Sequence, residues 1–271
     1  MDERELSHLR EWFVGFSSSF HGSSEEEQRN IALKEEHTGL VCANIRRIAR
    51  EETRDAGRVA LAEACALFHD IGRFPQYRRY GTFKDSISVN HGVLGADLLA
   101  QGGALDKFPR NEQTIVIQAV RHHNAFAVPS SLDAECAFYL RLVRDADKLD
   151  IWRVFLEFYR LPEGERASAV SLGFPDLPGC SPDVIEALRR GEMVRLARVR
   201  SLNDFKLLQL SWVYDLNFPV SFRMLLERDY IGGLGKVLPP DEEVERAVQA
   251  VREFALCAAA RTGGDGCTIS A

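Results

Sequence analysis

With 271 residues, 45% of them hydrophobic and 27% charged, the chain has the length and composition of a globular protein with a sizeable core. Its formal net charge of −6 argues against general binding of nucleic acid or anionic membranes, although a local basic pocket remains compatible with it. No apolar run reaches the ~20 residues that cross a bilayer, and the acidic N-terminal residues do not resemble a signal peptide. The six cysteines form no C-x-x-C pair. We therefore expect a cytoplasmic protein without disulfides.

The segments with a clear hydrophobic period have the spacing of α-helices. Residues 3–16 carry apolar side chains three and four positions apart, which predicts an amphipathic helix. Ser24, followed three positions later by Glu27, is typical of a capping box and predicts a second helix that runs to about Glu52. The same reasoning predicts helices over 59–68, 91–100, 111–123 and 133–160.

Between and beyond these helices, proline and glycine mark irregular stretches. We expect one from Gly72 to Asn90 and another from Leu161 to Cys180. Shorter helices are then predicted over 182–190, 192–200, 203–216 and 241–260. No repeat and no strand pattern rises above background, so the predicted fold class is all-α.

The most informative local feature is the pair His69-Asp70, which follows the apolar helix predicted over 59–68. An imidazole and a carboxylate are costly to bury there unless something binds them. A divalent metal ion accepts both kinds of ligand. Five of the seven histidines lie between positions 37 and 123, which suggests one metal site assembled from several helices. The five are His37, His69, His91, His122 and His123.

An octahedral ion would be served by His37, His69-Asp70 and an aspartate from the helix predicted over 133–160. Periodicity does not choose between Asp145 and Asp147, because both flank the apolar stripe of that helix by one residue.

The order His37, His69-Asp70, Asp147 resembles that of the HD superfamily of metal-dependent phosphohydrolases, which are all-helical. Residues 67–73, Leu-Phe-His-Asp-Ile-Gly-Arg, are similar to the family's L-x-H-D-I-G-K/R segment, and 145–150, Asp-Ala-Asp-Lys-Leu-Asp, to its A-D-K/R-L-D segment. The resemblance implies that His37, His69, Asp70 and Asp147 bind the metal. It selects Asp147 because the family's ligand follows the alanine, which leaves Asp145 or Asp150 for a supporting hydrogen bond.

A second ion is suggested by two further segments. Residues 90–96 resemble the H-x-x-x-G segment of HD-GYP phosphodiesterases, and 121–124 resemble their paired histidine. The resemblance implies that His91 and His122 bind a second ion with Asp70 bridging, while His123 is an alternative ligand or a supporting residue. The opposing interpretation is that these histidines contact substrate or lie on the surface. No Gly-Tyr-Pro follows the pair, which argues against a cyclic dinucleotide substrate.

The loop after His69-Asp70 is basic and aromatic. Arginine presents a planar fork that suits phosphate oxygens, and Arg73 stands where dinuclear relatives carry a lysine near the metal. Arg73, Arg78 and Lys84 are therefore the predicted substrate contacts, although Arg78 and Lys84 could equally be solvated loop charges.

The function predicted from the resemblance is hydrolysis of a phosphoester by metal-activated water, with a nucleotide or another small phosphorylated molecule as substrate. One or two divalent ions (Mn, Fe or Mg) are expected as cofactor. Asp70 would bridge them, Arg73 would stabilise charge, and His123 or Asp145 would carry a proton. The alternatives are a mixed-valent di-iron oxygenase, as in myo-inositol oxygenase, and a non-catalytic binding or signalling module.

Three parts are expected along the chain. Residues 1–160 would form an HD domain with an N-terminal helix, 161–262 a helical extension that packs on it, and 263–271 a disordered tail. The sequence leaves the oligomeric state open.

Overall fold

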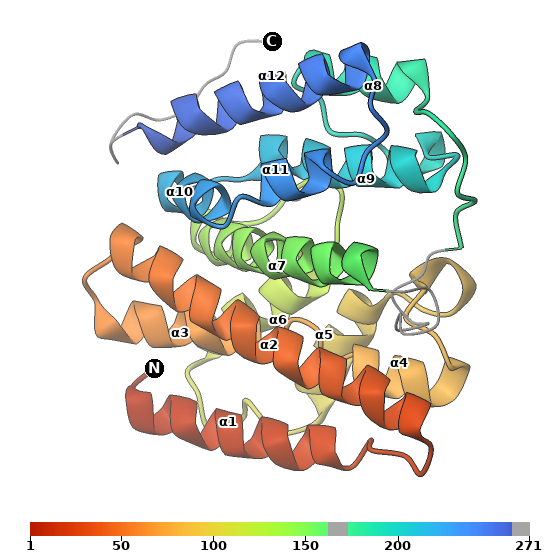
Figure 1. The fold of residues 1–271 in the computed structure, drawn as a ribbon. Helices are drawn as coiled ribbons and strands as arrows, with labels where there is room; N and C mark the ends of the chain where they lie inside the picture. Colours follow the sequence, from red (N-terminus) through yellow and green to blue (C-terminus); the bar gives the residue numbers. More distant parts are fainter. Residues whose placement is uncertain (162–172, 262–271) are drawn as a thin grey trace. The chain divides into compact units, whose positions relative to one another are not determined.

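A computed structural model describes residues 1–161 and 173–261 of the chain. These residues are helical and contain no β-strand, which confirms the all-α prediction (Figure 1). The chain divides into two compact units, Met1–Leu172 and Gly173–Ala271. The predicted tail 263–271 and most of the loop predicted after Leu161 lie outside the described residues. That the C-terminal part packs on the HD domain stays a prediction.

The first unit contains seven α-helices in its described part and one 3₁₀ turn, Asp85–Ile87. The helices are α1 (Glu3–Ser18), α2 (Glu25–Glu52), α3 (Ala56–Phe68), α4 (Arg73–Tyr80), α5 (His91–Gln101), α6 (Arg110–His122) and α7 (Ala134–Arg160). The second unit consists of α8 (Pro182–Arg189), α9 (Leu202–Ser211), α10 (Pro219–Glu227), α11 (Tyr230–Gly235) and α12 (Glu242–Ala259), with 3₁₀ turns at Leu196–Arg198 and Trp212–Asp215.

Side-chain caps fix where several helices begin. Ser24 and Glu27 form the predicted capping box at the start of α2. Asp133 caps α7 by accepting a hydrogen bond from the Cys136 backbone. Asn90 caps α5 in the same way, and this places His91 at the first helical position.

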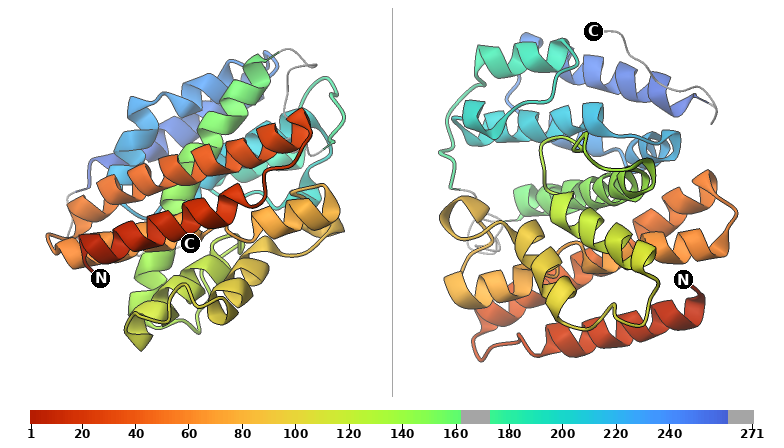
Figure 2. Two further views of the ribbon diagram at one scale, coloured as in Figure 1. Left: turned by 90° about the horizontal axis from the view of Figure 1, so that it is seen from below. Right: turned by 180° about the vertical axis from the view of Figure 1, so that it is seen from behind.

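The core of the first unit is organised around α3, which packs against α1, α2, α6 and α7. Its fully buried alanines at 62, 64 and 66 allow neighbouring helices to approach closely. The long helix α2 runs beside α3, and α7 crosses α2 obliquely (Figure 1 and Figure 2, left). Because α3 ends inside this bundle, His69 and Asp70 lie in the protein interior.

Two local predictions are wrong. The stretch from Gly72 to Asn90 is not irregular throughout, since α4 occupies Arg73–Tyr80. Pro75 is its third residue, and a proline in the first turn removes no helical hydrogen bond. The helix predicted over 192–200 is only a 3₁₀ turn.

The chain leaves the helical path after α8 for a physical reason. Gly191 adopts a positive φ of 73°, and its backbone N–H bonds to the carbonyl of Leu188. The N–H of Val194 then donates to the Ser211 hydroxyl at 3.0 Å instead of to a helical carbonyl.

Among the helices of the described residues, none has the length and hydrophobicity needed to cross a membrane.

Candidate metal centre

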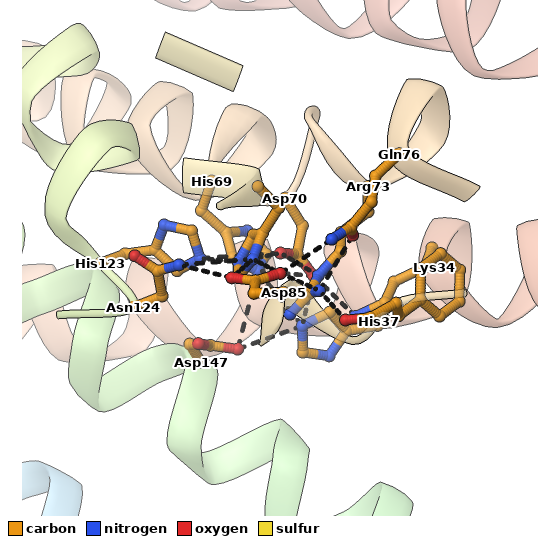
Figure 3. Close-up of polar contacts among 12 residues, drawn as sticks. Lys34, His37, His69, Asp70, Arg73, Gln76, Asp85, His123, Asn124 and Asp147 are labelled. Atoms are coloured by element: carbon orange, nitrogen blue, oxygen red, sulfur yellow. Dashed lines mark hydrogen bonds and ion pairs between the residues drawn. The ribbon is translucent and has the colours of Figure 1, made fainter. Parts of the chain in front are cut away.

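Six acidic and imidazole side chains from five different segments meet in the interior of the first unit (Figure 3). One histidine comes from α2, and a histidine and an aspartate follow the end of α3. The start of α5 and the end of α6 supply one histidine each, and α7 supplies an aspartate. They are His37, His69, Asp70, His91, His123 and Asp147. All are buried except Asp147, whose side chain is 14% exposed.

Asp70 lies between two pairs of histidines. Its Oδ2 lies 3.6 Å from His37 Nε2 and 3.7 Å from His69 Nε2. Its Oδ1 lies 3.2 Å from His91 Nε2 and 3.6 Å from His123 Nε2. The two oxygens of one carboxylate thus face two separate pairs of imidazole nitrogens.

The spacing within each group fits ligands that share an ion. His37 Nε2 and His69 Nε2 lie 3.2 Å apart, and Asp147 Oδ1 lies 3.1 Å and 3.6 Å from them. His91 Nε2 and His123 Nε2 lie 2.9 Å apart. Ligand atoms at about 2.1 Å from an octahedral ion stand about 3.0 Å apart at neighbouring positions. The residues therefore have the spacing that one ion per group requires.

Each of the four imidazoles is oriented by a hydrogen bond at its other nitrogen. His37 Nδ1 lies 2.6 Å from Asp150 Oδ2, and His91 Nδ1 lies 2.7 Å from Asp85 Oδ2. His69 and His123 donate through Nδ1 to backbone carbonyls, of Ala66 at 2.7 Å and of Val120 at 2.8 Å.

These contacts have a consequence for the protons. A carbonyl or carboxylate only accepts, so each Nδ1 carries the hydrogen, and in the neutral form of a ring its Nε2 has a free lone pair. Four Nε2 atoms and the oxygens of Asp70 and Asp147 then face one another. A cation satisfies such a set of converging acceptors, and the donor types suit a divalent transition metal.

Glycines allow the turn after α3 to approach α5. A Cβ on Gly72 would lie 2.1 Å from the carbonyl oxygen of His91 and 2.7 Å from the backbone nitrogen of Gly95. A Cβ on Gly95 would in turn lie 3.1 Å from the Gly72 nitrogen. The spacing His91-x-x-x-Gly95 therefore has a packing reason, because it brings the first turn of α5 against the turn that holds Asp70.

Burial and neighbouring charges shift the pKa values of the site. Burial and the nearby Arg73 lower the pKa of His91 to about 3, so its ring is neutral, as a ligand must be. Burial opposes ionisation of Asp85, but the hydrogen bond with His91 outweighs it and lowers the Asp85 pKa to about 2. The Asp70 pKa also lies well below its usual range because Lys34 and the neighbouring histidines outweigh the effect of burial.

The structure corrects one predicted ligand. His122 is the last residue of α6 and is partly exposed, whereas the buried His123 supplies the nitrogen beside His91 and Asp70. The hydrogen bond from His123 Nδ1 to Val120 turns its ring inward. The second group of converging atoms is therefore Asp70, His91 and His123, which agrees with the alternative interpretation of His123 as a ligand.

Of the three predicted substrate contacts, one lies at the site. Arg73 Nε stands 3.4 Å from Asp70 Oδ1, and its Nη1 stands 3.0 Å from Asp85 Oδ1. Arg78 instead donates to the carbonyl of Ser19 and covers the ring of Phe20, so it anchors the end of α1. Lys84 contributes backbone groups to the hydrogen bonds of its own loop.

Sequence reasoning missed two polar residues of the centre. Asp85 holds His91, and Lys34 donates to Asp70 Oδ2 at 2.7 Å. Lys34 stands three positions before His37, on the same face of α2, and this spacing was a usable signal. Asp85 gave none, because it belongs to the turn before α5 and reaches His91 only through the tertiary fold.

The comparison with family models agrees with this geometry. The model described as HD domain matches residues 35–152. This range contains all six converging side chains. Neither the search of curated proteins nor that of solved structures gave a match. Together with the two groups of histidines around Asp70, this match identifies residues 35–152 as an HD domain.

Proposed function

We propose that the protein is a metal-dependent phosphohydrolase that cleaves a phosphoester of a small molecule, with nucleotides among the candidate substrates. The observation that carries the proposal is the placement of Asp70 between two groups of imidazole nitrogens. The HD domain over residues 35–152 supports the same reaction class, because members of that superfamily are commonly metal-dependent hydrolases.

The residues divide between two ion positions. His37, His69, Asp70 and Asp147 would hold one divalent ion, and Asp70, His91 and His123 would hold the other. When bound, such ions lower the pKa of water and neutralise charge on phosphoryl oxygens.

Other side chains of the protein orient the histidines and supply positive charge beside these positions. Asp150 and Asp85 fix the rings of His37 and His91 through Nδ1. Arg73 keeps a guanidinium beside Asp70 with its side chain 17% exposed, so it can meet an entering anion. Asp147 is also partly exposed, whereas His69 is fully buried. Substrate would therefore approach the site where Arg73 and Asp147 are exposed.

The test is phosphate release from a panel of nucleotides and generic phosphoesters. The protein would be loaded anaerobically with Mn²⁺ or Fe²⁺, and His69→Ala would be compared with the exposed-surface control Lys107→Gln. We expect release that requires metal, is lost in His69→Ala and persists in Lys107→Gln. Two bound irons with oxygen consumption and no release would indicate the di-iron oxygenase instead. Ligand binding that is independent of metal, without turnover, would indicate a non-catalytic module.

The remaining expectations belong to the same proposal. A small phosphorylated substrate would be the principal partner. A cytoplasmic location, expected from the cysteine pattern, would be the place of this activity.

A further inference from the structure

Lys34 is the one cationic side chain of α2 that reaches the metal centre. Its Nζ lies 2.7 Å from Asp70 Oδ2, and its side chain is 16% exposed. The ammonium also stands 5.4 Å from the centre of the Phe83 ring, which restricts it further. Lys34 is thus held at the edge of the site while remaining in contact with solvent.

Arg73 approaches the same carboxylate from the other oxygen. Its Nε is 3.4 Å from Asp70 Oδ1, and its guanidinium carbon lies 5.9 Å from the Phe83 ring. Figure 3 shows Lys34 and Arg73 on one side of Asp70, with His123 and Asn124 on the other. Two partly exposed cations therefore approach Asp70, one at each carboxylate oxygen.

A charge balance shows what this pair can bind. The centre and its supporting shell contain four carboxylates (Asp70, Asp85, Asp147 and Asp150) and three cations (Lys34, Arg73 and Arg153), which gives a net charge of −1 from 3 − 4. Two divalent ions would change this balance to +3. A bound ion would also interact with the Asp70 oxygen that Lys34 contacts. The negative charge of Asp70 would then be shared with the ion, and the ammonium would lose part of its counter-charge. A dianion is then the ligand that best restores neutrality.

We propose that Lys34, together with Arg73, binds the phosphate group of the substrate, and that this group is the dianionic phosphate of a monoester. The inference rests on the proposed function. It adds a substrate-binding residue on α2 and selects monoesters over diesters, because a diester carries only one negative charge.

Removing the charge of Lys34 should change the affinity for metal and the affinity for phosphate in opposite directions. In Lys34→Gln, Asp70 no longer has a competing ammonium, so we expect Mn²⁺ to bind several-fold more tightly. Inorganic phosphate should bind the Mn²⁺-loaded variant about tenfold or more weakly, because a charge-assisted contact is lost. Lys34→Arg should keep both affinities close to those of the wild type, and the exposed Lys107→Gln should change neither. Titration calorimetry measures both affinities on the full chain.

The outcomes separate this inference from the proposed function. If the wild type binds Mn²⁺ and phosphate but Lys34→Gln changes neither affinity, or lowers both together, only the role of Lys34 is overturned. If the wild type binds no divalent ion, the proposed function fails and the role of Lys34 fails with it. The substrate class is tested with p-nitrophenyl phosphate and bis-p-nitrophenyl phosphate. A higher kcat/KM for the monoester, reduced in Lys34→Gln, supports the inference, and a wild-type preference for the diester overturns it.

Discussion

The carboxylate of Asp150 accepts a hydrogen bond from His37 Nδ1 at 2.6 Å in the interior of the first unit. Arg153 donates two hydrogen bonds to the same carboxylate, from Nε to Oδ1 at 2.7 Å and from Nη2 to Oδ2 at 3.1 Å. The acceptor at Nδ1 leaves the Nε2 lone pair of His37 directed at His69 and Asp147. Asp150 and Arg153 therefore act on the candidate metal centre through the orientation of one ring.

Replacing this acceptor should weaken metal binding without removing a ligand. In Asp150→Asn, the amide can rotate its NH₂ toward His37 and no longer enforces the Nδ1–H form. We expect Mn²⁺ affinity to fall by about 10- to 100-fold, the range known for such supporting residues. The matched control is Glu157→Gln, which alters another partner of Arg153 that does not touch His37. Equal Mn²⁺ affinities in the two variants would contradict the orienting role.

Replacing Asp85 should weaken metal binding at the other ion position. Its carboxylate holds His91 Nδ1 and also accepts from Gln76 and Asn124. In Asp85→Asn we expect the ion held by His91 and His123 to be lost first, so that the number of Mn²⁺ ions retained per chain after loading falls from two to one. Metal analysis after gel filtration measures this ratio. Loss of both ions, or of neither, would count against two separate positions.

The adjacent histidines offer a direct test of which one is a ligand. His123→Ala removes a nitrogen that lies 2.9 Å from His91 Nε2, whereas His122→Ala trims a partly exposed side chain outside this group. We expect His123→Ala to reduce the number of bound ions and His122→Ala to leave it unchanged. The reverse pattern in metal content would restore the assignment predicted from sequence.

Gly72 is a position where any side chain should destabilise the fold. The Cβ of Gly72→Ala would lie 2.1 Å from the His91 carbonyl oxygen, and that neighbour is backbone that cannot rotate away. We expect a loss of about 2 kcal/mol or more in the free energy of unfolding. Gly39→Ala is the control, because its Cβ meets nothing within 4 Å and alanine favours a helix by up to about 1 kcal/mol. Urea unfolding of both variants measures the difference, and equal stabilities would refute the close approach.

The depressed pKa of His91 predicts how the ion-free protein responds to acid. Its pKa is about 3 in the folded protein against an ordinary value of 6.5. Below pH 6.5 the unfolded chain takes up a proton at this position, and the folded protein does not until about pH 3. The His91 contribution to stability therefore falls as the pH falls through this window, by at most about 1.4 kcal/mol per pH unit.

Removing the imidazole should remove this part of the pH dependence. Urea unfolding in the presence of a chelator at pH 7, 6 and 5 should show a smaller loss of stability for His91→Gln than for the wild type. Parallel curves for the two proteins would show that His91 is not held neutral in the folded state.

The sequence by itself determined the features that depend on neighbouring residues. The capping box of Ser24 and Glu27 marks the start of α2, because its hydrogen bonds join positions three residues apart. The pair His69-Asp70 and the residues around Asp147 carried the family resemblance in short segments. Hydrophobic period was enough for the all-α class, and these segments, together with residues 90–96, were enough for five of the six converging side chains.

Only the tertiary structure decided which groups from distant segments meet. The choice of His123 over His122 depends on how the chain turns after α6, where the Val120 carbonyl orients the ring. Asp85 reaches His91, and Lys34 reaches Asp70, across helix packing that no local pattern encodes. The helical period places a side chain on a face, but the partner of that face is set by the packing of the whole bundle.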